Sequence, residues 1–253
     1  GIGDDSVAAG GGANTILGGD GNDTLIAGTG SDSINAGSGD DSVNAGFGSS
    51  TILGLDGNDT LIAGSGADSI NAGTGDDSVD ASTGNDTLSG GAGNDTLVGG
   101  TGTDWASYAS AAGAVTVDLG ASSSSGADGT DRLTGIENVI GGEGDDHIIG
   151  NDIANLLIGG NGADTLEGGD GDDSLVGGDG NDSIIGNDIK TGIMGLTRRN
   201  DGKKFVLHDA FMPADCNCSY ITYTYRNPFT GEILQANAAI DGLQKIIFED
   251  GVR

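Results

Sequence analysis

The chain has 253 residues, of which 52 are glycine, 2 are proline, 1 is tryptophan, 4 are tyrosine and 5 are phenylalanine. So few aromatic side chains exclude an ordinary globular core, and so much glycine without a collagen period indicates a repeat protein or a disordered chain. The net charge of −30 excludes a nucleic-acid partner, because an acidic surface repels phosphate.

The negative charge lies almost entirely before residue 195, and the rest of the chain carries as many basic as acidic side chains. Such acidity is typical of a solvated or disordered surface, and disorder is the state that we expect without metal. No run approaches the roughly 18 apolar residues of a membrane span, and no signal peptide is visible. The chain opens at Gly1 inside a repeat, so we expect a fragment or a processed piece of a longer protein.

A nine-residue pattern recurs without a slip from residue 1 to residue 107. It is clearest over 54–98, where the fourth residue of each repeat is glycine, the sixth is aspartate and the eighth is a large aliphatic residue. A disordered chain does not need an aspartate every nine residues, so the pattern favours a repeat fold.

Each nonapeptide combines a turn with a minimal strand. Its six glycine-dense residues can take positive φ and turn sharply, and the other three, such as 60–62, alternate outward, inward and outward. One inward aliphatic side chain per repeat cannot hold a chain together, so the turns must stack and share a core. Two nonapeptides form one coil, and residues eighteen apart therefore lie one above the other.

The sixth positions then form two columns on opposite edges of the roll. The first column holds Asp5, Asp23, Asp41, Asp59, Asp77 and Asp95; the second holds Asn14, Asp32, Ser50, Asp68, Asp86 and Asp104. Carboxylates stacked at roughly the 5 Å inter-strand spacing repel one another. A hard cation with roughly six to eight oxygen ligands removes that conflict, which suits calcium but not the strict octahedron of magnesium or the nitrogen and sulfur preference of zinc. Because the second column carries Asn14 and Ser50, we expect it to bind calcium more weakly.

This pattern resembles G-G-x-G-x-D-x-U-x, the nonapeptide of the RTX (repeats-in-toxin) family, over residues 1–107 and 132–190. The resemblance implies an all-β, right-handed parallel β-roll (a β-helix solenoid), in two stacked blocks, that binds multiple Ca²⁺ ions. It also implies type I secretion, passage in the unfolded state where cytosolic calcium is low, and folding outside the cell. The physical logic agrees, since self-repulsion of the acidic chain opposes a compact state until cations bind.

Residues 108–140 interrupt the repeats as a linking segment. The stretch 114–119 (AVTVDL) alternates like a strand, and the serine-rich stretch 121–130 is predicted to be a flexible loop. The whole arrangement resembles the spacer between RTX blocks.

Trp105 stands where the first roll, residues 1–107, gives way to this spacer. It is either a ligand-stacking residue or, as we favour, a plug for the open end of the first roll, where the inward side chain has shrunk to Ala106.

The repeats resume over 141–194, the predicted second roll, with sixth positions at Asp146, Asn155, Asp164, Asp173 and Asp182. The turn at 150–158 is a weak metal turn, because Asn151 and Ile153 replace glycines, and His147 is predicted to be a surface residue rather than a ligand. The predicted calcium ligands are thus Asp5, Asp23, Asp32, Asp41, Asp59, Asp68, Asp77, Asp86, Asp95, Asp104, Asp146, Asp164, Asp173 and Asp182.

The outward ninth positions of the second roll include one apolar stripe, formed by Ile158, Val176 and Met194. A contiguous apolar patch usually marks an interface. We therefore expect this stripe to be covered, either by residues 195–253 or by a second subunit.

Residues 195–253 are predicted to form a small C-terminal β or α+β cap or assembly domain. The run 220–225 alternates as a strand, 227–231 contains a turn signal and 232–235 is the return strand. The end, 245–251, resembles the segment that closes an RTX roll. Cys216 and Cys218 are interpreted as free thiols or a strained disulfide on a loop, because no second cysteine pair completes a zinc site.

No H-E-x-x-H, nucleophile elbow or P-loop occurs, and paired carboxylates such as Asp40 and Asp41 follow the repeat, so we predict no enzymatic activity. One hypothesis is a secreted, extracellular structural or cell-surface protein of S-layer, adhesin or filament type, with self-assembly or a surface partner acting through the C-terminal region. The other is the folding and secretion module of a secreted RTX enzyme or toxin. The length of the array and a longer period of 36 residues favour the first.

Overall fold

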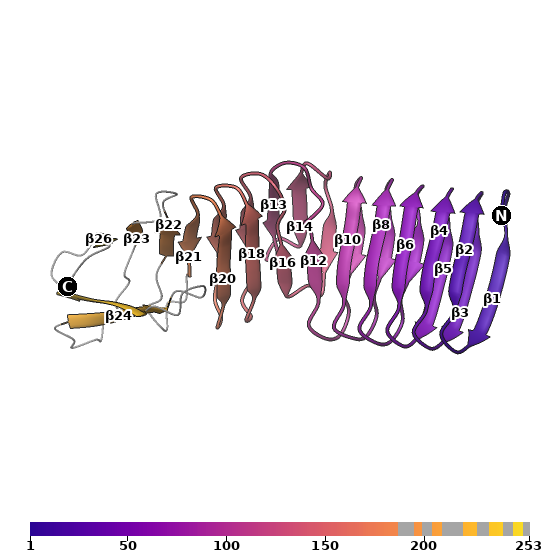
Figure 1. Cartoon of the computed structure of the whole chain (residues 1–253), viewed down its shortest axis with the longest axis horizontal. Helices are drawn as coiled ribbons and strands as arrows, with labels where there is room; N and C mark the ends of the chain where they lie inside the picture. The colour runs from indigo at the N-terminus through magenta and orange to yellow at the C-terminus, as the bar shows by residue number, and fades with distance from the viewer. Residues whose placement is uncertain (187–194, 199–203, 209–219, 227–232, 240–244, 250–253) are drawn as a thin grey trace.

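The computed structural model describes residues 1–186, 195–198, 204–208, 220–226, 233–239 and 245–249. Every regular element in these residues is a β-strand. The strands are stacked along one long axis, with the N-terminus at one end and the C-terminal strands at the other (Figure 1). The predicted all-β solenoid is confirmed.

Two hydrogen-bonded sheets form the faces of the roll. The first sheet contains, in spatial order, β1 (Ser6–Gly11), β3 (Thr24–Thr29), β5 (Ser42–Phe47), β7 (Thr60–Ile62), β9 (Ser78–Asp80), β11 (Thr96–Val98), β15 (Arg132–Thr134), β14 (Ser123–Gly126), β13 (Val115–Asp118), β17 (His147–Ile149), β19 (Thr165–Glu167), β21 (Ser183–Ile185), β22 (Gly195–Arg198), β23 (Lys204–His208) and β26 (Lys245–Glu249). The second sheet contains β2 (Thr15–Asp20), β4 (Ser33–Ser38), β6 (Thr51–Asp56), β8 (Ser69–Thr74), β10 (Thr87–Ala92), β12 (Trp105–Ser107), β16 (Asn138–Ile140), β18 (Leu156–Asn161) and β20 (Ser174–Asp179).

Parallel pairing in both sheets joins residues eighteen apart in the sequence, as the repeat predicts. Leu25 pairs with Val43, which pairs with Leu61, in one row across the first sheet. These eighth-position side chains are at most 1% exposed, and the first-position residues beside them, such as Ala45 and Ala63, are equally buried. Burying a large aliphatic side chain contributes roughly 1.5–3 kcal/mol, and this burial requires stacked coils, so a single repeat has no fold of its own.

Glycine at the fourth position is required by the turn. Gly57 has a φ of 136°, and a Cβ atom there would lie 2.0 Å from the carbonyl oxygen of Gly39 in the preceding coil. The second position also takes a positive φ, even where it is not glycine: φ is 85° at Leu55 and 70° at Ser82. Because this conformation costs an L-residue roughly 1–2 kcal/mol, the stacking of coils imposes it on these two residues.

Residues 108–140 carry both sheets onward. In the second sheet, β12 pairs in parallel with β10 on one side and with β16 on the other, and β16 pairs with β18. In the first sheet, β15 pairs in parallel with β11, and an antiparallel connection through β14 and β13 then leads to β17. The two rolls therefore share their sheets, and the strand expected over 114–119 is confirmed as β13.

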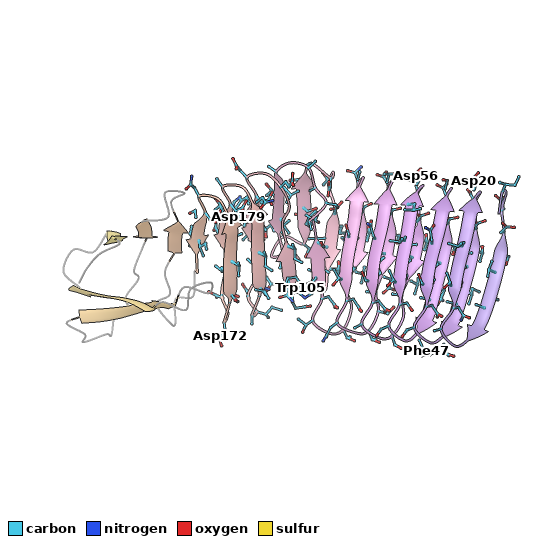
Figure 2. The ribbon with its side chains drawn as sticks, in the orientation of Figure 1. Asp20, Phe47, Asp56, Trp105, Asp172 and Asp179 are labelled. Atoms are coloured by element: carbon cyan, nitrogen blue, oxygen red, sulfur yellow. The ribbon has the colours of Figure 1, made fainter. Side chains whose placement is uncertain are left out.

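Two expectations for the region from Trp105 to residue 140 are wrong. The serine-rich stretch contains β14, and Ser124 within it is buried, so the stretch is not simply a flexible loop. Trp105 does not plug an open end, because β12 pairs with strands on both sides and Trp105 is an outward, partly exposed residue between Thr87 and Asn138 (Figure 2). The aromatic side chain buried at this level is Tyr108, which is 3% exposed.

The described parts of 195–249 are strands. β22 adds to β21 in antiparallel, and β23 and β26 follow. The predicted hairpin is confirmed as β24 (Tyr220–Arg226) paired with β25 (Ile233–Ala239). Val176 of the apolar stripe is 42% exposed, whereas Met194, Cys216 and Cys218 lie outside the described residues.

Candidate metal centre

The sixth-position aspartates stack as two columns, one on each edge of the roll. Asp20 and Asp56, from the repeats of the first column, lie at one edge, and Phe47, from a repeat of the second column, lies at the opposite edge (Figure 2). Within the first column, the backbone N–H of each aspartate donates to the Oδ1 atom of the aspartate one coil further on. The distance is 2.8 Å from Asp41 to Asp59 and 2.7 Å from Asp59 to Asp77.

The second oxygen of these carboxylates has no partner. Among the described residues, ten carboxylate Oδ2 atoms are buried without a hydrogen bond, and they belong to Asp23, Asp32, Asp41, Asp59, Asp68, Asp77, Asp86, Asp95, Asp104 and Asp164. A buried polar atom without a partner is costly and rare in native proteins. Because all ten occupy the same position of the repeat, we interpret them as a set of acceptors for a common ligand.

The electrostatics of the columns also oppose ionised carboxylates without a cation. Burial raises the pKa of Asp59, Asp86 and Asp164 to about 6. Burial also raises the pKa of Asp95 to about 7, and the like charges of Asp131 and Asp77 contribute in the same direction. The columns therefore favour any ligand that brings positive charge to Oδ2.

The chemistry of this donor set fits calcium. Each turn offers a carboxylate oxygen together with the carbonyl oxygens of a glycine-rich backbone, which are the hard ligands that calcium takes in a flexible arrangement. The residues that would hold the ions are the ten with unpartnered Oδ2 atoms, and a bound ion would supply the charge that offsets their mutual repulsion. Among the described residues, no three His, Cys, Asp or Glu side chains cluster at one point, and each coil contributes at most one buried sixth-position carboxylate per edge.

The remaining predicted ligands have other surroundings. Asp5 is exposed, and its Oδ2 lies 3.2 Å from the N-terminal ammonium group of Gly1. Asp146 accepts the N–H of Val115 on Oδ1 and the N–H of Gly142 on Oδ2, each at 2.8 Å. Asp173 accepts the N–H of Asn155 at 2.9 Å, and Asp182 accepts that of Asp164 at 3.1 Å. Their roles as calcium ligands stay predictions.

The two edges of the first roll differ in their hydrogen bonding. On the first edge the fifth-position side chains form a continuous, exposed ladder, in which each side-chain oxygen accepts the N–H one coil further on. Its members are Asp4, Asn22, Asp40, Asn58, Asp76 and Asn94. On the second edge Ser49 and Asn85 make the same contact. There Ser50 breaks the carboxylate column: its hydroxyl accepts the N–H of Asp32 at 3.2 Å. The expected weaker calcium binding of this edge stays a prediction.

Two column members lie in the spacer and were missed from the sequence. Asp131 accepts the N–H of Asp95 at 3.0 Å, and Glu137 accepts the N–H of Asp104 at 2.8 Å. The signal for Asp131 was present, because GADGTDRLT over 126–134 is a nonapeptide in phase with the first roll. The signal for Glu137 was not, since glutamate replaces aspartate and no glycine-rich turn precedes it.

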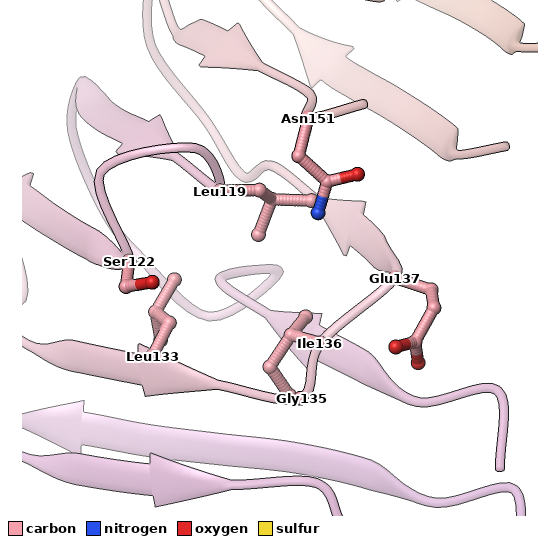
Figure 3. A pocket seen from close by; sticks show the side chains of 7 residues that line it. All are labelled: Leu119, Ser122, Leu133, Gly135, Ile136, Glu137 and Asn151. Carbon is pink, nitrogen blue, oxygen red and sulfur yellow. The ribbon is translucent and has the colours of Figure 1, made fainter. Parts of the chain in front are cut away.

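A pocket of about 150 Å³ opens at the same level, between the end of β15 and the turn at Asn151 (Figure 3). Leu119, Leu133 and Ile136 line it together with the polar side chains of Ser122, Glu137 and Asn151. Glu137 is already engaged by the N–H of Asp104. These described lining residues include no histidine or cysteine, so the pocket offers no nucleophile with an adjacent imidazole base.

His147 lies at an outward position of β17, as predicted, and its Nε2 atom is 3.1 Å from Oε1 of Glu167 on β19. Both side chains are partly exposed, at 42% and 31%. A polar contact between side chains of this exposure contributes little to stability.

These features define a class of protein: a parallel β-roll whose turns present buried carboxylates to calcium. A family model described as the RTX calcium-binding nonapeptide repeat matches residues 1–34, 17–52, 44–79, 53–88, 71–106, 133–166 and 158–188. Because these matches cover more than half of the chain, the chain belongs to the RTX calcium-binding nonapeptide repeat family. A comparison with curated proteins gives no match. In the part of the chain that the structure describes, no helix is long and apolar enough to span a membrane.

Proposed function

We propose that the chain is an extracellular, non-catalytic structural segment of S-layer, adhesin or filament type, which folds into a rod on binding calcium after type I secretion. The observation that carries this proposal is the set of ten buried Oδ2 atoms without a partner. Such a set stabilises a rod only when cations are present. A low-calcium compartment therefore keeps the chain unfolded, and a calcium-rich one folds it.

The length of the sheets supports a mechanical role. Fifteen strands in the first sheet and nine in the second follow one axis, and each coil contacts its neighbours through backbone ladders on both faces. A rod of this construction is long and stiff along its axis, which suits a surface array or a stalk.

The alternative is the folding and secretion module of a secreted RTX enzyme or toxin. It is favoured by the antiparallel strands β22, β23 and β26, which follow β21 and end the parallel stacking of the first sheet. A roll whose parallel stacking gives way to antiparallel strands suits a module attached to another domain better than it suits a polymer of identical coils.

Circular dichroism tests the calcium-dependent fold. We expect a coil spectrum in EGTA and a β spectrum on addition of millimolar Ca²⁺, with magnesium at the same concentration as the control that leaves the coil. A β spectrum that persists in chelator would contradict the proposal, because the carboxylate columns would then be stable without cations.

Sedimentation and electron microscopy of the calcium-loaded chain separate the two functions. Filaments or two-dimensional arrays at micromolar concentration support the structural role. A monodisperse monomer at every concentration supports the module. The same samples in EGTA provide the control, since neither form assembles from an unfolded chain.

A further inference from the structure

The junction, which we define as residues 108–155, joins the first roll to the second. Its column members, Asp131, Glu137, Asp146 and Asn155, differ from the nine buried aspartates of the first roll in one respect: none of them is among the ten with an unpartnered Oδ2 atom. The inference drawn below from this difference rests on the calcium-binding function proposed above, because both concern the same columns.

Asp131 occupies a true repeat position. It belongs to the in-phase nonapeptide 126–134, and its Oδ1 atom accepts the N–H of Asp95 at 3.0 Å. The N–H of Arg132 donates to the carbonyl oxygen of Asp95 at 2.8 Å. The same contact in the first roll runs from Ser78 to the carbonyl oxygen of Asp59, also at 2.8 Å. By its backbone hydrogen bonds, Asp131 is therefore the next member of the first column after Asp95.

The second oxygen of Asp131 is in a different situation from that of Asp59. It accepts the hydroxyl of Tyr108 at 2.9 Å and the hydroxyl of Ser124 at 2.7 Å. All three residues are at most 4% exposed. A carboxylate oxygen has about two lone-pair sites for donors, so two hydroxyl groups fill the side of Asp131 on which the other coils leave Oδ2 free.

We propose that Tyr108 and Ser124 take the place of the calcium ion at Asp131, which makes the level of Asp131 a metal-free joint between two calcium-binding rolls. The neighbour of β15 in the first sheet, on the side away from β11, supports this assignment. This neighbour is β14, which is antiparallel to β15 and pairs Ser123 with Arg132. Within the described residues, the next glycine-rich turn lies against residues 108–114 rather than against Asp131. The second half of a calcium site is therefore missing there, and the two hydroxyl groups stabilise the charge by direct hydrogen bonds.

The opposite edge of the junction makes a similar substitution with different chemistry. Asn155 stands at a sixth position, where its Oδ1 atom accepts the N–H of Asn151 at 2.8 Å. Its Nδ2 group donates to the carbonyl oxygen of Glu137, one coil earlier, at 2.7 Å. A neutral amide that donates to a turn carbonyl connects two coils without a cation. Both edges are thus closed by hydrogen bonds within the same segment.

Ion counting on matched variants tests the joint. Asp131→Asn and Asp59→Asn make the same isosteric change at equivalent repeat positions, and bound calcium is counted by equilibrium dialysis and atomic emission at saturation. We expect Asp131→Asn to bind as many ions as the wild type, with a midpoint within about twofold, and Asp59→Asn to lose at least one ion. Loss of an ion by Asp131→Asn would overturn the inference. A wild-type chain that binds no calcium would instead refute the proposed function, so the two failures are distinguishable.

A second measurement needs no variant and covers the case in which Asp131→Asn does not fold. In crystals of the calcium-loaded wild type, anomalous scattering locates the ions. We expect ions on the Oδ2 atoms of Asp59 and Asp77, and the hydroxyls of Tyr108 and Ser124 on Oδ2 of Asp131 with no ion. An ion bound to Oδ2 of Asp131 would overturn the inference.

Discussion

The first roll and the junction solve the same structural problem in opposite ways. Both stack aspartate or related side chains along the edges of a continuous pair of sheets, and both hold Oδ1 with a backbone N–H from the preceding coil, as at Asp59 and Asp131. At nine aspartates of the first roll, from Asp23 to Asp104, the second oxygen is left buried and unpartnered. In the junction it is satisfied by hydroxyl groups from Tyr108 and Ser124.

The difference shows what regular repetition can and cannot do. A nonapeptide repeated in phase places an identical carboxylate in every coil, and identical groups cannot neutralise one another. An external cation is therefore needed. The spacer breaks the repetition and brings residues distant in sequence, such as Tyr108 and Asp131, into contact. An internal donor then becomes available.

The largest expected effect is the response of the two regions to chelation. In EGTA the amides of 20–104 should lose nearly all protection against hydrogen exchange, because the charges of the columns are no longer offset. The amides of 108–155 should exchange more slowly, since their column members are paired internally. Hydrogen–deuterium exchange with and without calcium, read peptide by peptide, measures this. Equal exchange in both regions in chelator would remove the distinction.

Acid should replace calcium in the first roll. Burial raises the pKa of Asp95 to about 7 and of Asp59 to about 6, whereas the ordinary value of an aspartate is 3.8. The folded state therefore retains protons that the unfolded state releases. The stability of the metal-free roll is highest below about pH 4 and falls as the pH rises through about 6 to 7.

In buffers from which calcium has been removed beforehand, a sample at about pH 5, which is above the isoelectric point of about 4.1, should accordingly show more β signal than one at about pH 8. Circular dichroism at the two pH values measures the effect, and Asp95→Asn should reduce the difference because it removes one of the titrating groups. A metal-free roll that gains stability as the pH rises would contradict the sign of these shifts.

Truncation of the core should affect both regions alike when calcium is present. Leu61→Ala and Leu133→Ala remove buried eighth-position side chains, at 0% and 2% exposure, and each should lower the free energy of unfolding by about 2–5 kcal/mol. In chelator only Leu133→Ala should still change the exchange of its region, because the first roll is already open. Leu17→Ala, at 70% exposure, is the control and should change stability by no more than about 0.5 kcal/mol.

The smallest expected effect concerns the two edges of the first roll. Ser50→Asp restores a carboxylate to the second column at a buried position, and it should lower the calcium midpoint of folding severalfold because a ligand charge is added. Thr51→Asp adds the same charge at an exposed outward position and should leave the midpoint nearly unchanged. Isothermal titration of the two variants side by side decides the point. Equal midpoints would mean that the edges do not differ in the way their sequences suggest.

The sequence alone determined the parts of this protein that depend on period. Aspartate at every sixth position and an aliphatic residue at every eighth position define which side chains face the core and which stack on the edges, because strand alternation and coil length leave no other arrangement. The core residues Leu25, Val43 and Leu61, the two columns and the preference for calcium all follow from this spacing.

Tertiary structure decided what happens where the period stops. The sequence predicted Trp105 as the plug and 121–130 as a loop, but β12 pairs on both sides and Ser124 is buried in β14. No local sequence pattern predicts the hydrogen bond between Tyr108 and Asp131, which are twenty-three residues apart. Nor does one predict that Glu137 takes the place of an aspartate in the second column. Such contacts depend on how a non-repeating segment folds back on the sheets, which is how the hydroxyl groups of Tyr108 and Ser124 come to donate to Asp131.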